Sequence, residues 1–222
     1  MKKTILTLTT LLIIGNISFA QYTNWNSDNS ENRNAVFMNI GYDYSLSLGA
    51  GYNHSFNIFT IPALFGVEFS KPMGDDLFDD HKIKIGAEVA VINKNNFCLS
   101  AVVKGIIRRN ANEYVNIESF GSDLGLKAGI YKPNWYLAGE FGFDKAITSY
   151  LEHSDLYRDL YPQAKDGWYV PTAGQFYYGV ITGFSIGNIV DINLKVGLTN
   201  AEGQQKNALL PYYAQLGLSK SF

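Results

Sequence analysis

The 222-residue chain lacks features that mark whole classes of protein. Its single cysteine, Cys98, excludes an intramolecular disulfide and any cysteine pair with metal-ligand spacing. It has no excess of basic residues, whereas a nucleic-acid partner normally requires a concentrated basic face, so no nucleic-acid partner is expected. Beyond residue 17 it has no apolar run of about eighteen residues, so this part of the sequence predicts no α-helical membrane span.

The first twenty residues are predicted to be a secretory signal peptide that is cleaved from the fold. Lys2 and Lys3 form a basic start, residues 5–17 are largely apolar, and residues 18–20 (Ser-Phe-Ala) match a small-x-small cleavage site. Gln21 would follow the cut, which argues against a lipoprotein anchor. Removing the two lysines from the 18 basic residues leaves 16 against 20 acidic ones, a net charge of about −4.

The composition is apolar, although no long apolar run accounts for it. Hydrophobic residues make up 46% of the chain and aromatic residues 14%. Alternating strands produce this combination, because one face of each strand can meet lipid while the other faces a polar interior. Residues 21–34 are polar and without periodicity, which predicts a flexible periplasmic lead. The chain is therefore divided into 1–20, 21–34 and a barrel at 35–222.

From residue 36 onward, apolar and polar residues alternate with the period of two that β-strands require. Residues 36–56 alternate for too long to form one membrane strand, and a tight turn near Asp43–Ser45 would split them without changing the phase. Further strands are predicted at residues 59–70, 82–91, 97–108, 120–130, 135–144, 175–186, 190–199 and 210–222. The fold class is therefore all-β, an antiparallel up-and-down barrel of ten strands, or of eight without residues 36–56.

The predicted connections alternate in length. Short turns are expected at residues 57–58, 94–96, 133–134 and 187–189. Longer connections are expected at residues 72–80, 110–118, 149–174 and 200–208. Transmembrane barrels have short periplasmic turns and long extracellular loops, so both chain ends are expected on the periplasmic side.

Charged residues within the strands lie almost wholly on the polar phase. A charge facing lipid at mid-bilayer costs roughly 2–4 kcal/mol, so this phase is expected to face the barrel interior. The predicted interior charge network is Glu68, Lys84, Glu88, Lys104, Arg108, Asp123, Lys127, Glu140, Asp144, Asp191 and Lys195. Barrels of about eight strands are filled by their own side chains, so a plugged interior is favoured over a small-solute channel.

A soluble β-sandwich or a lipocalin-like barrel would also alternate, but with the apolar phase turned inward. Two features favour the membrane barrel instead. Glycines crowd the polar phase, as expected where a narrow interior must be packed, and aromatic residues collect near the predicted strand ends.

The longest connection, residues 149–174, is predicted to be a contact surface. Ser154 is placed to cap a short helix that Pro162 would end. The candidate contact residues are Tyr150, Tyr157, Tyr161, Trp168 and Tyr169. Loops longer than about 12–15 residues are often functional, although these aromatics could instead fold the loop onto the barrel rim.

No catalytic residue, metal site or cofactor is predicted, and the chain is not expected to be an enzyme. His81 follows two aspartates at a predicted strand start, where a solvated cluster is favoured over a catalytic base. His153 precedes Ser154 and Asp155, a pattern typical of a polar helix start. A lipid-modifying or proteolytic surface enzyme is the least favoured alternative.

The last predicted strand ends on an aromatic residue, Phe222. Together with the signal peptide, the alternation and the loop asymmetry, this ending resembles the small outer-membrane β-barrel proteins of Gram-negative bacteria, of the OmpA/OmpX type or the PorT-like superfamily. The resemblance implies an outer-membrane location, contact with outer-membrane lipid and insertion by the barrel-assembly machinery. Its assembly signal would be Tyr212, Leu216, Leu218 and Phe222. An extracellular or envelope protein is the expected partner of the long loop.

Overall fold

The computed structural model describes residues 24–25, 34–43, 45–73, 80–171, 174–187, 189–202 and 211–222. The predicted signal peptide and most of the predicted lead lie outside the described residues. The strands are β1 (Asn34–Tyr42), β2 (Leu46–Ile58), β3 (Ile61–Pro72), β4 (His81–Lys94), β5 (Phe97–Ala111), β6 (Val115–Lys132), β7 (Trp135–His153), β8 (Gly167–Tyr169), β9 (Gly174–Ile186), β10 (Val190–Ala201) and β11 (Tyr212–Ser221), and the helix is α2 (Asp155–Leu160).

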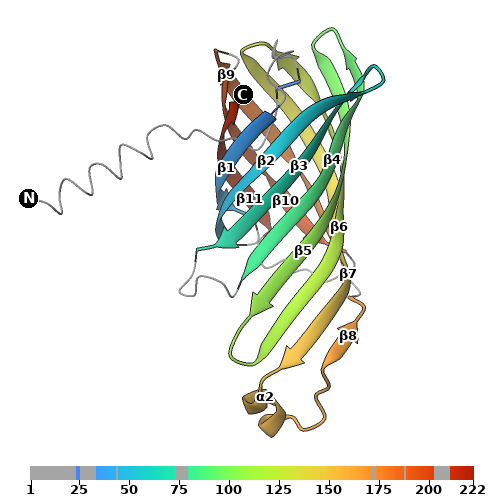
Figure 1. Ribbon diagram of the computed structural model, residues 1–222, viewed down its shortest axis with the longest axis vertical. Helices are drawn as coiled ribbons and strands as arrows, with labels where there is room; N and C mark the ends of the chain where they lie inside the picture. Colours follow the sequence, from blue (N-terminus) through green and yellow to red (C-terminus); the bar gives the residue numbers. More distant parts are fainter. Residues whose placement is uncertain are drawn as a thin grey trace, which may run out of the picture.

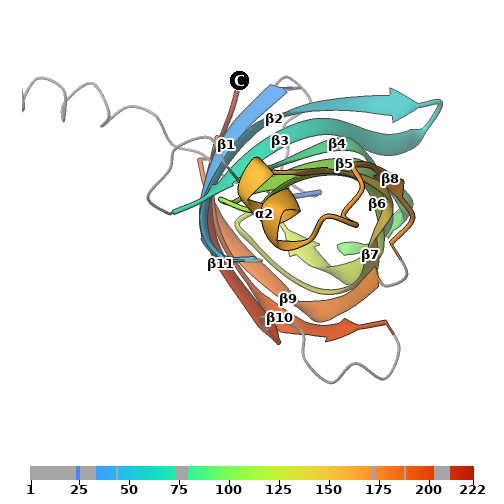
Figure 2. The same ribbon diagram turned by 90° about the horizontal axis from the view of Figure 1, so that it is seen from below.

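All strands except β8 form one closed antiparallel barrel in chain order (Figure 1). The ring closes where β1 pairs with β11, with Met38 opposite Leu218, and the view along the barrel shows this closure (Figure 2). Asn34 and Phe222 extend the ladder by exchanging backbone hydrogen bonds of 3.2 and 2.8 Å. β8 pairs only with residues 149–151 of β7 and lies outside the ring. The prediction of an all-β barrel with ten strands is therefore confirmed, including the split of residues 36–56.

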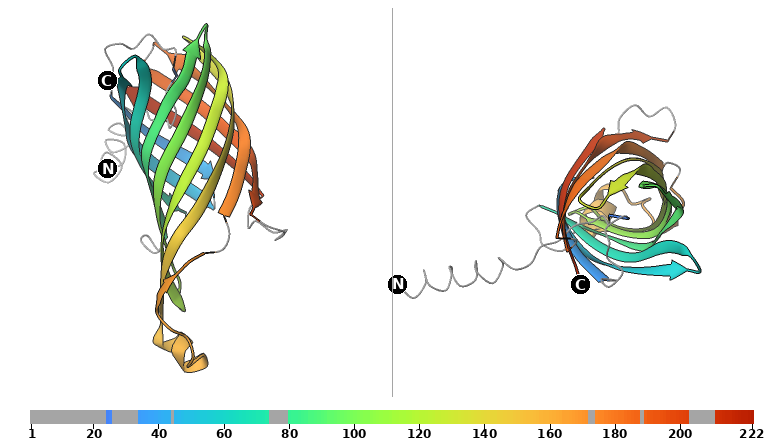
Figure 3. Two further views of the ribbon diagram at one scale, coloured as in Figure 1. Left: turned by 90° about the vertical axis from the view of Figure 1, so that its right-hand side faces the viewer. Right: turned by 90° about the horizontal axis from the view of Figure 1, so that it is seen from above.

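The barrel has two unlike ends. The short turns after β2, β4, β6 and β9 lie at the end that carries the C-terminus, at the top of Figure 1, which we call the short-turn end. The opposite end, which we call the loop end, carries the β5–β6 connection and the segment containing α2 and β8 (Figure 3). Strand length follows the same asymmetry, since β7 has 19 residues and β1 has 9.

Two predicted boundaries are wrong at the loop end. The connection expected at residues 110–118 shrinks to three residues, because β5 continues to Ala111 and β6 begins at Val115. The connection expected to begin at Ser149 begins later, because β7 remains paired with β6 as far as His153. These strand ends lose the apolar alternation but keep their backbone ladder, so the pattern that marked the strands could not show where they stop.

One short turn is also displaced. The turn expected at residues 57–58 lies instead at Phe59 and Thr60, because Asn57 pairs with Pro62 and Ile58 with Ile61. Phe59 takes the left-handed conformation, with φ of 57°, and its side chain is 98% exposed. Residues such as Asn usually occupy this conformation and Phe rarely does, so residues 59–60 carry no turn signal in the sequence.

The two faces of the barrel wall differ in polarity. Large apolar side chains remain exposed on the outer face, among them Phe65, Ile85, Val103, Leu124, Phe141, Val180, Leu194 and Leu216. Buried positions on the alternate phase include many charged and polar side chains, among them Glu68, Lys82, Glu88, Asp123, Lys127, Glu140 and Asn193. The barrel is therefore apolar outside and polar inside. Among the described residues, no helix is long and apolar enough to cross a membrane.

Candidate functional site

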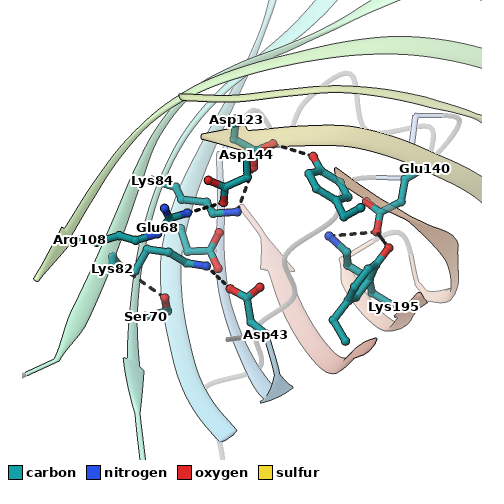
Figure 4. A network of polar contacts seen from close by, with 12 residues as sticks. Asp43, Glu68, Ser70, Lys82, Lys84, Arg108, Asp123, Glu140, Asp144 and Lys195 are labelled. Carbon is teal, nitrogen blue, oxygen red and sulfur yellow. Dashed lines mark hydrogen bonds and ion pairs between the residues drawn. The ribbon is translucent and has the colours of Figure 1, made fainter. Parts of the chain in front are cut away.

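The charged residues of the polar phase meet inside the barrel and form ion pairs across it (Figure 4). Lys84 of β4 reaches Asp123 of β6 at 2.9 Å, and Lys127 of β6 reaches Glu88 of β4 at 2.5 Å. Ser100 of β5 also donates a hydrogen bond of 2.6 Å to Glu88. The two ion pairs skip β5, so each one ties together strands that the backbone ladder does not join directly.

A second cluster links β7 with β10 and β11. Glu140 of β7 accepts from Lys195 of β10 at 3.0 Å and from the hydroxyl of Tyr213 of β11 at 2.6 Å. The Lys195 ammonium lies 5.3 Å from the ring centroid of Tyr177 and 5.0 Å from that of Tyr213, within cation–π range. Tyr177 donates a hydrogen bond of 2.7 Å to Asp123 and so connects the two clusters. The sequence analysis did not assign a role to either tyrosine.

Toward the loop end, two further ion pairs join the interior. Lys82 pairs with Asp43, and Arg108 of β5 pairs with Asp144 of β7. Asp43 lies in the turn after β1, and the sequence analysis treated it only as a turn residue. The turn therefore places a carboxylate over the interior, where it meets Lys82, which is 4% exposed.

The remaining predicted interior residues have other partners. Glu68 accepts a hydrogen bond of 3.1 Å from Asn39, and Asp191 accepts from the hydroxyl of Ser185. Lys104 lines a cavity of about 20 Å³ together with Glu68, Glu88 and Lys84, which is room for roughly one water molecule. Among the described residues, the centre of the barrel therefore carries several ion pairs and hydrogen bonds between polar side chains.

At the short-turn end the interior also contains an apolar layer. A cluster that we call the mouth cluster consists of Ala90, Cys98, Tyr131, Tyr136, Ala138 and Ile181, all at most 5% exposed. The rings of Tyr131 and Tyr136 stack with centroids 5.4 Å apart. Trp25 packs against this cluster. The polar phase is thus not polar throughout, and the sequence analysis missed this apolar layer.

Interior glycines make room for the aromatic side chains of neighbouring strands. A Cβ atom on Gly183 of β9 would lie 2.5 Å from the ring of Tyr136, and Tyr177 occupies the same kind of space beside Gly142. A Cβ atom on Gly179 or Gly197 would likewise lie 2.3 Å from the hydroxyl oxygen of Tyr213. Ring packing therefore accounts for some of the glycines on the polar phase, whereas others face asparagine side chains, such as Gly49 beside Asn39, or the backbone of a neighbouring strand.

The segment between β7 and β9 folds into a hairpin, which we call the loop-end hairpin, built from the end of β7, α2 and β8. Ser154 caps α2, with its hydroxyl accepting from the backbone N–H of Tyr157 at 3.2 Å, as predicted. Asp166, which precedes β8, links the two sides of the hairpin. It accepts a hydrogen bond of 2.8 Å from the backbone N–H of His153 in β7 and one of 2.5 Å from Arg158 in α2. The hydrogen bonds from the His153 backbone and ring, with those from Arg158, lower the pKa of Asp166.

The five predicted contact residues divide into two groups. Tyr150 and Tyr157 are half-buried, because Tyr150 packs edge-on against Trp168 and the ring of Tyr157 stacks on His153 at 5.0 Å. Tyr161, Trp168 and Tyr169 are exposed, Trp168 by 62%. Further exposed apolar side chains that the sequence analysis did not name are Leu156, Leu160 and Val170. Part of the aromatic set therefore folds the hairpin and part remains on its surface.

The other residues considered from the sequence occupy the wall. His54 shares a hydrogen bond of 2.9 Å with Asn34, and the ring of His81 stacks on Phe69. Among the described residues, no group of three or more His, Cys, Asp or Glu side chains is placed to hold a metal ion. The predicted assembly-signal residues Tyr212, Leu216, Leu218 and Phe222 are all exposed.

In a closed barrel no sheet edge is left open, so the backbone N–H and C=O groups of the wall can all be hydrogen-bonded within lipid. The protein's apolar outer face and charged interior also suit this environment. Its architecture is that of an outer-membrane β-barrel. No protein-family profile and no curated protein matches the chain. Among solved structures, it is similar to the β-domain of the Bordetella autotransporter BrkA, with 12% identity and a TM-score of 0.38 over 85% of this chain and 98% of that chain. This likeness is too distant to transfer a function.

Proposed function

We propose that this protein is an outer-membrane β-barrel that is closed by its own side chains and displays the loop-end hairpin as a contact surface. The partner would be an extracellular or envelope protein. The single observation that carries the proposal is the contrast between an interior crossed by ion pairs and an exposed apolar hairpin. Ion pairs such as Lys84–Asp123 lie inside the ring of strands, which supports a closed interior, whereas Trp168 and Leu160 are 62% and 63% exposed.

Strand length supports display of the hairpin outside the bilayer. A tilted membrane strand needs about 9–11 residues, a length that β1 and β11 match with 9 and 10. β6 and β7 have 18 and 19 residues, so several residues of each would stand beyond the hydrocarbon region. The hairpin continues from this extension. Its exposed apolar side chains would then face water rather than lipid, which is typical of an interaction surface.

Membrane location and surface display have one common test on intact cells. Trypsin added to cells should cut the hairpin after Arg158 or Lys165, and the barrel fragments should stay in the outer-membrane fraction with heat-modifiable gel migration. The variant Arg158→Gln/Lys165→Gln should resist this cleavage and fractionate unchanged. A soluble periplasmic product, or cleavage only after cell lysis, would contradict the proposal.

Ion conductance separates the closed barrel from the alternative of a small-solute channel. Purified barrel in a planar bilayer is expected to give no reproducible conductance steps, because ion pairs such as Lys84–Asp123 and Lys127–Glu88 would obstruct the path of ions through the interior. Regular single-channel steps would favour the channel instead. We further propose that the outward residues of β11 present the assembly signal to the barrel-assembly machinery.

A further inference from the structure

Asn24 and Trp25 lie far from β1 in space, although they precede it in the chain. Both lie inside the ring of strands at the short-turn end, where they form the short blue segment within the barrel (Figures 2 and 3). Every residue that they are recorded to contact belongs to β4, β5, β6, β7 or β9, or to the β6–β7 turn. The direct neighbours of β1 in the barrel are β2 and β11. These contacts of the pair therefore lie on a part of the wall that includes neither β1 nor its direct neighbours.

The contacts of Asn24 are specific for a side-chain amide. Its Nδ2 donates to the backbone oxygens of Lys132 at 2.7 Å and Pro133 at 3.2 Å, and to the hydroxyl of Ser185 at 3.0 Å. Asn24 is only 2% exposed, so an amide without these partners would be costly to bury. Ser185 in turn donates to Asp191, which connects the amide to a buried carboxylate.

Trp25 supplies the apolar part of the contact. It packs against the mouth cluster, which contains the stacked rings of Tyr131 and Tyr136 and the thiol of Cys98. Cys98 is 1% exposed. An indole over this cluster shields it from water on the side of the mouth, while the ion pairs around Glu88 and Lys127 lie deeper in the interior.

We propose that the mouth of the barrel is a recognition site for the chain's own segment at Asn24 and Trp25, which acts as a removable plug. We define the mouth site as the mouth cluster together with the carbonyl oxygens of Lys132 and Pro133 and the hydroxyl of Ser185. The ring of strands closes through the ladder between β1 and β11, so undocking the segment leaves the barrel intact. The site would take a peptide in which an amide side chain is followed by an indole.

Cys98 is a native reporter for the plug, because it is the chain's single cysteine. The folded protein in detergent micelles is treated with a small negatively charged methanethiosulfonate reagent, and the rate of thiol labelling is measured. The double variant Asn24→Ala/Trp25→Ala should label about tenfold faster than the wild type or more, because the thiol is then reached without local opening. Trp168→Ala, which removes an exposed indole from the hairpin, should label at the wild-type rate.

Recognition is tested by adding the segment back. A synthetic peptide of residues 21–30 should slow labelling of the double variant, and the same peptide with alanine at both positions should not. If Cys98 is labelled at the same rate in the wild type and the double variant, the proposal that residues 24 and 25 act as a plug is wrong. A wild-type peptide without effect would overturn the recognition site.

A second measurement tests the position of Trp25 without the double variant Asn24→Ala/Trp25→Ala, in case that variant does not fold. In the variant Trp135→Phe/Trp168→Phe, Trp25 is the single tryptophan, and its fluorescence should be blue-shifted and protected from iodide. Emission typical of indole in water, with full quenching by iodide, would overturn the proposal.

Discussion

The barrel interior and the loop-end hairpin both contain ion pairs and aromatic contacts, but the sequence separation between the paired residues differs. Interior pairs such as Lys127–Glu88 join residues 39 positions apart and are almost fully buried. Hairpin pairs such as Arg158–Asp155 join residues three apart and are largely exposed. Buried charges are strongly destabilising when one partner is lost, whereas exposed pairs contribute little. Losing one partner of an interior pair is therefore expected to destabilise the barrel, whereas losing a hairpin pair is expected to change its stability little.

The largest effect is expected from breaking an interior pair. Lys127→Ala leaves the Glu88 carboxylate, 9% exposed, without the ammonium 2.5 Å away. An uncompensated buried charge costs about 3–5 kcal/mol, so the free energy of unfolding should fall by that amount. Urea unfolding of the barrel in detergent, followed by tryptophan fluorescence, measures it.

The matched control removes both charges at once. Glu88→Gln/Lys127→Met should recover most of the loss, because neither group then remains charged and unpaired. If Lys127→Ala alone unfolds at the wild-type urea concentration, the interior pairs do not stabilise the barrel and the contrast with the hairpin fails.

A smaller effect is expected from filling the space beside an interior ring. Gly183→Ala puts a Cβ atom 2.5 Å from the ring of Tyr136, and overpacking of this kind costs typically about 1–3 kcal/mol. Gly139→Ala is the control, since its Cβ would meet nothing closer than 3.9 Å. Urea unfolding should show a lower midpoint for Gly183→Ala only, and Gly183→Ala/Tyr136→Leu should restore it. Equal midpoints for both alanine variants would show that ring packing does not limit the interior.

The sequence predicts the wall of the barrel well, because two physical costs shape it residue by residue. Charges are expensive in lipid, so Glu68, Lys84 and Asp123 had to lie on the inner phase. The period of two then assigns every other residue of a strand. Turns such as Pro133-Asn134 follow from the same pattern, because they must preserve the pairing of the strands.

The partners inside the barrel could not be predicted, because they depend on the stagger between strands. Alternation places Lys84 and Asp123 on one face but does not say that they meet. Asp43 lies on the polar phase of residues 36–56, but the alternation does not name Lys82 as its partner. Asn24 and Trp25 lie outside any periodic segment, so the pattern carried no information about them. The alternation pattern also misplaced the predicted ends of β5, β6 and β7. Backbone pairing continues there beyond the regular apolar alternation that marked these strands.

The smallest effect is expected in the hairpin and depends on pH. Asp166 accepts hydrogen bonds from His153 and Arg158, which lower its pKa in the folded hairpin. A carboxylate with a lowered pKa contributes stability above its unfolded pKa, near 3.9, and that stability is lost as the pH falls through the folded value. The hairpin should therefore be unaffected by this group between about pH 5 and 8 and should loosen only below about pH 4.

The amide proton of His153 reports this titration, because the His153 backbone nitrogen donates to Oδ1 of Asp166 over a nitrogen–oxygen distance of 2.8 Å. Its chemical shift, followed by NMR in micelles, should change with a midpoint below about 3.9, and Asp166→Asn should abolish that step. At neutral pH, Asp166→Asn should speed tryptic cleavage after Arg158 while the urea midpoint of the barrel stays within a few tenths of a kcal/mol, since exposed pairs contribute little. A barrel destabilised by Asp166→Asn would mean that the hairpin and the interior fold as one unit.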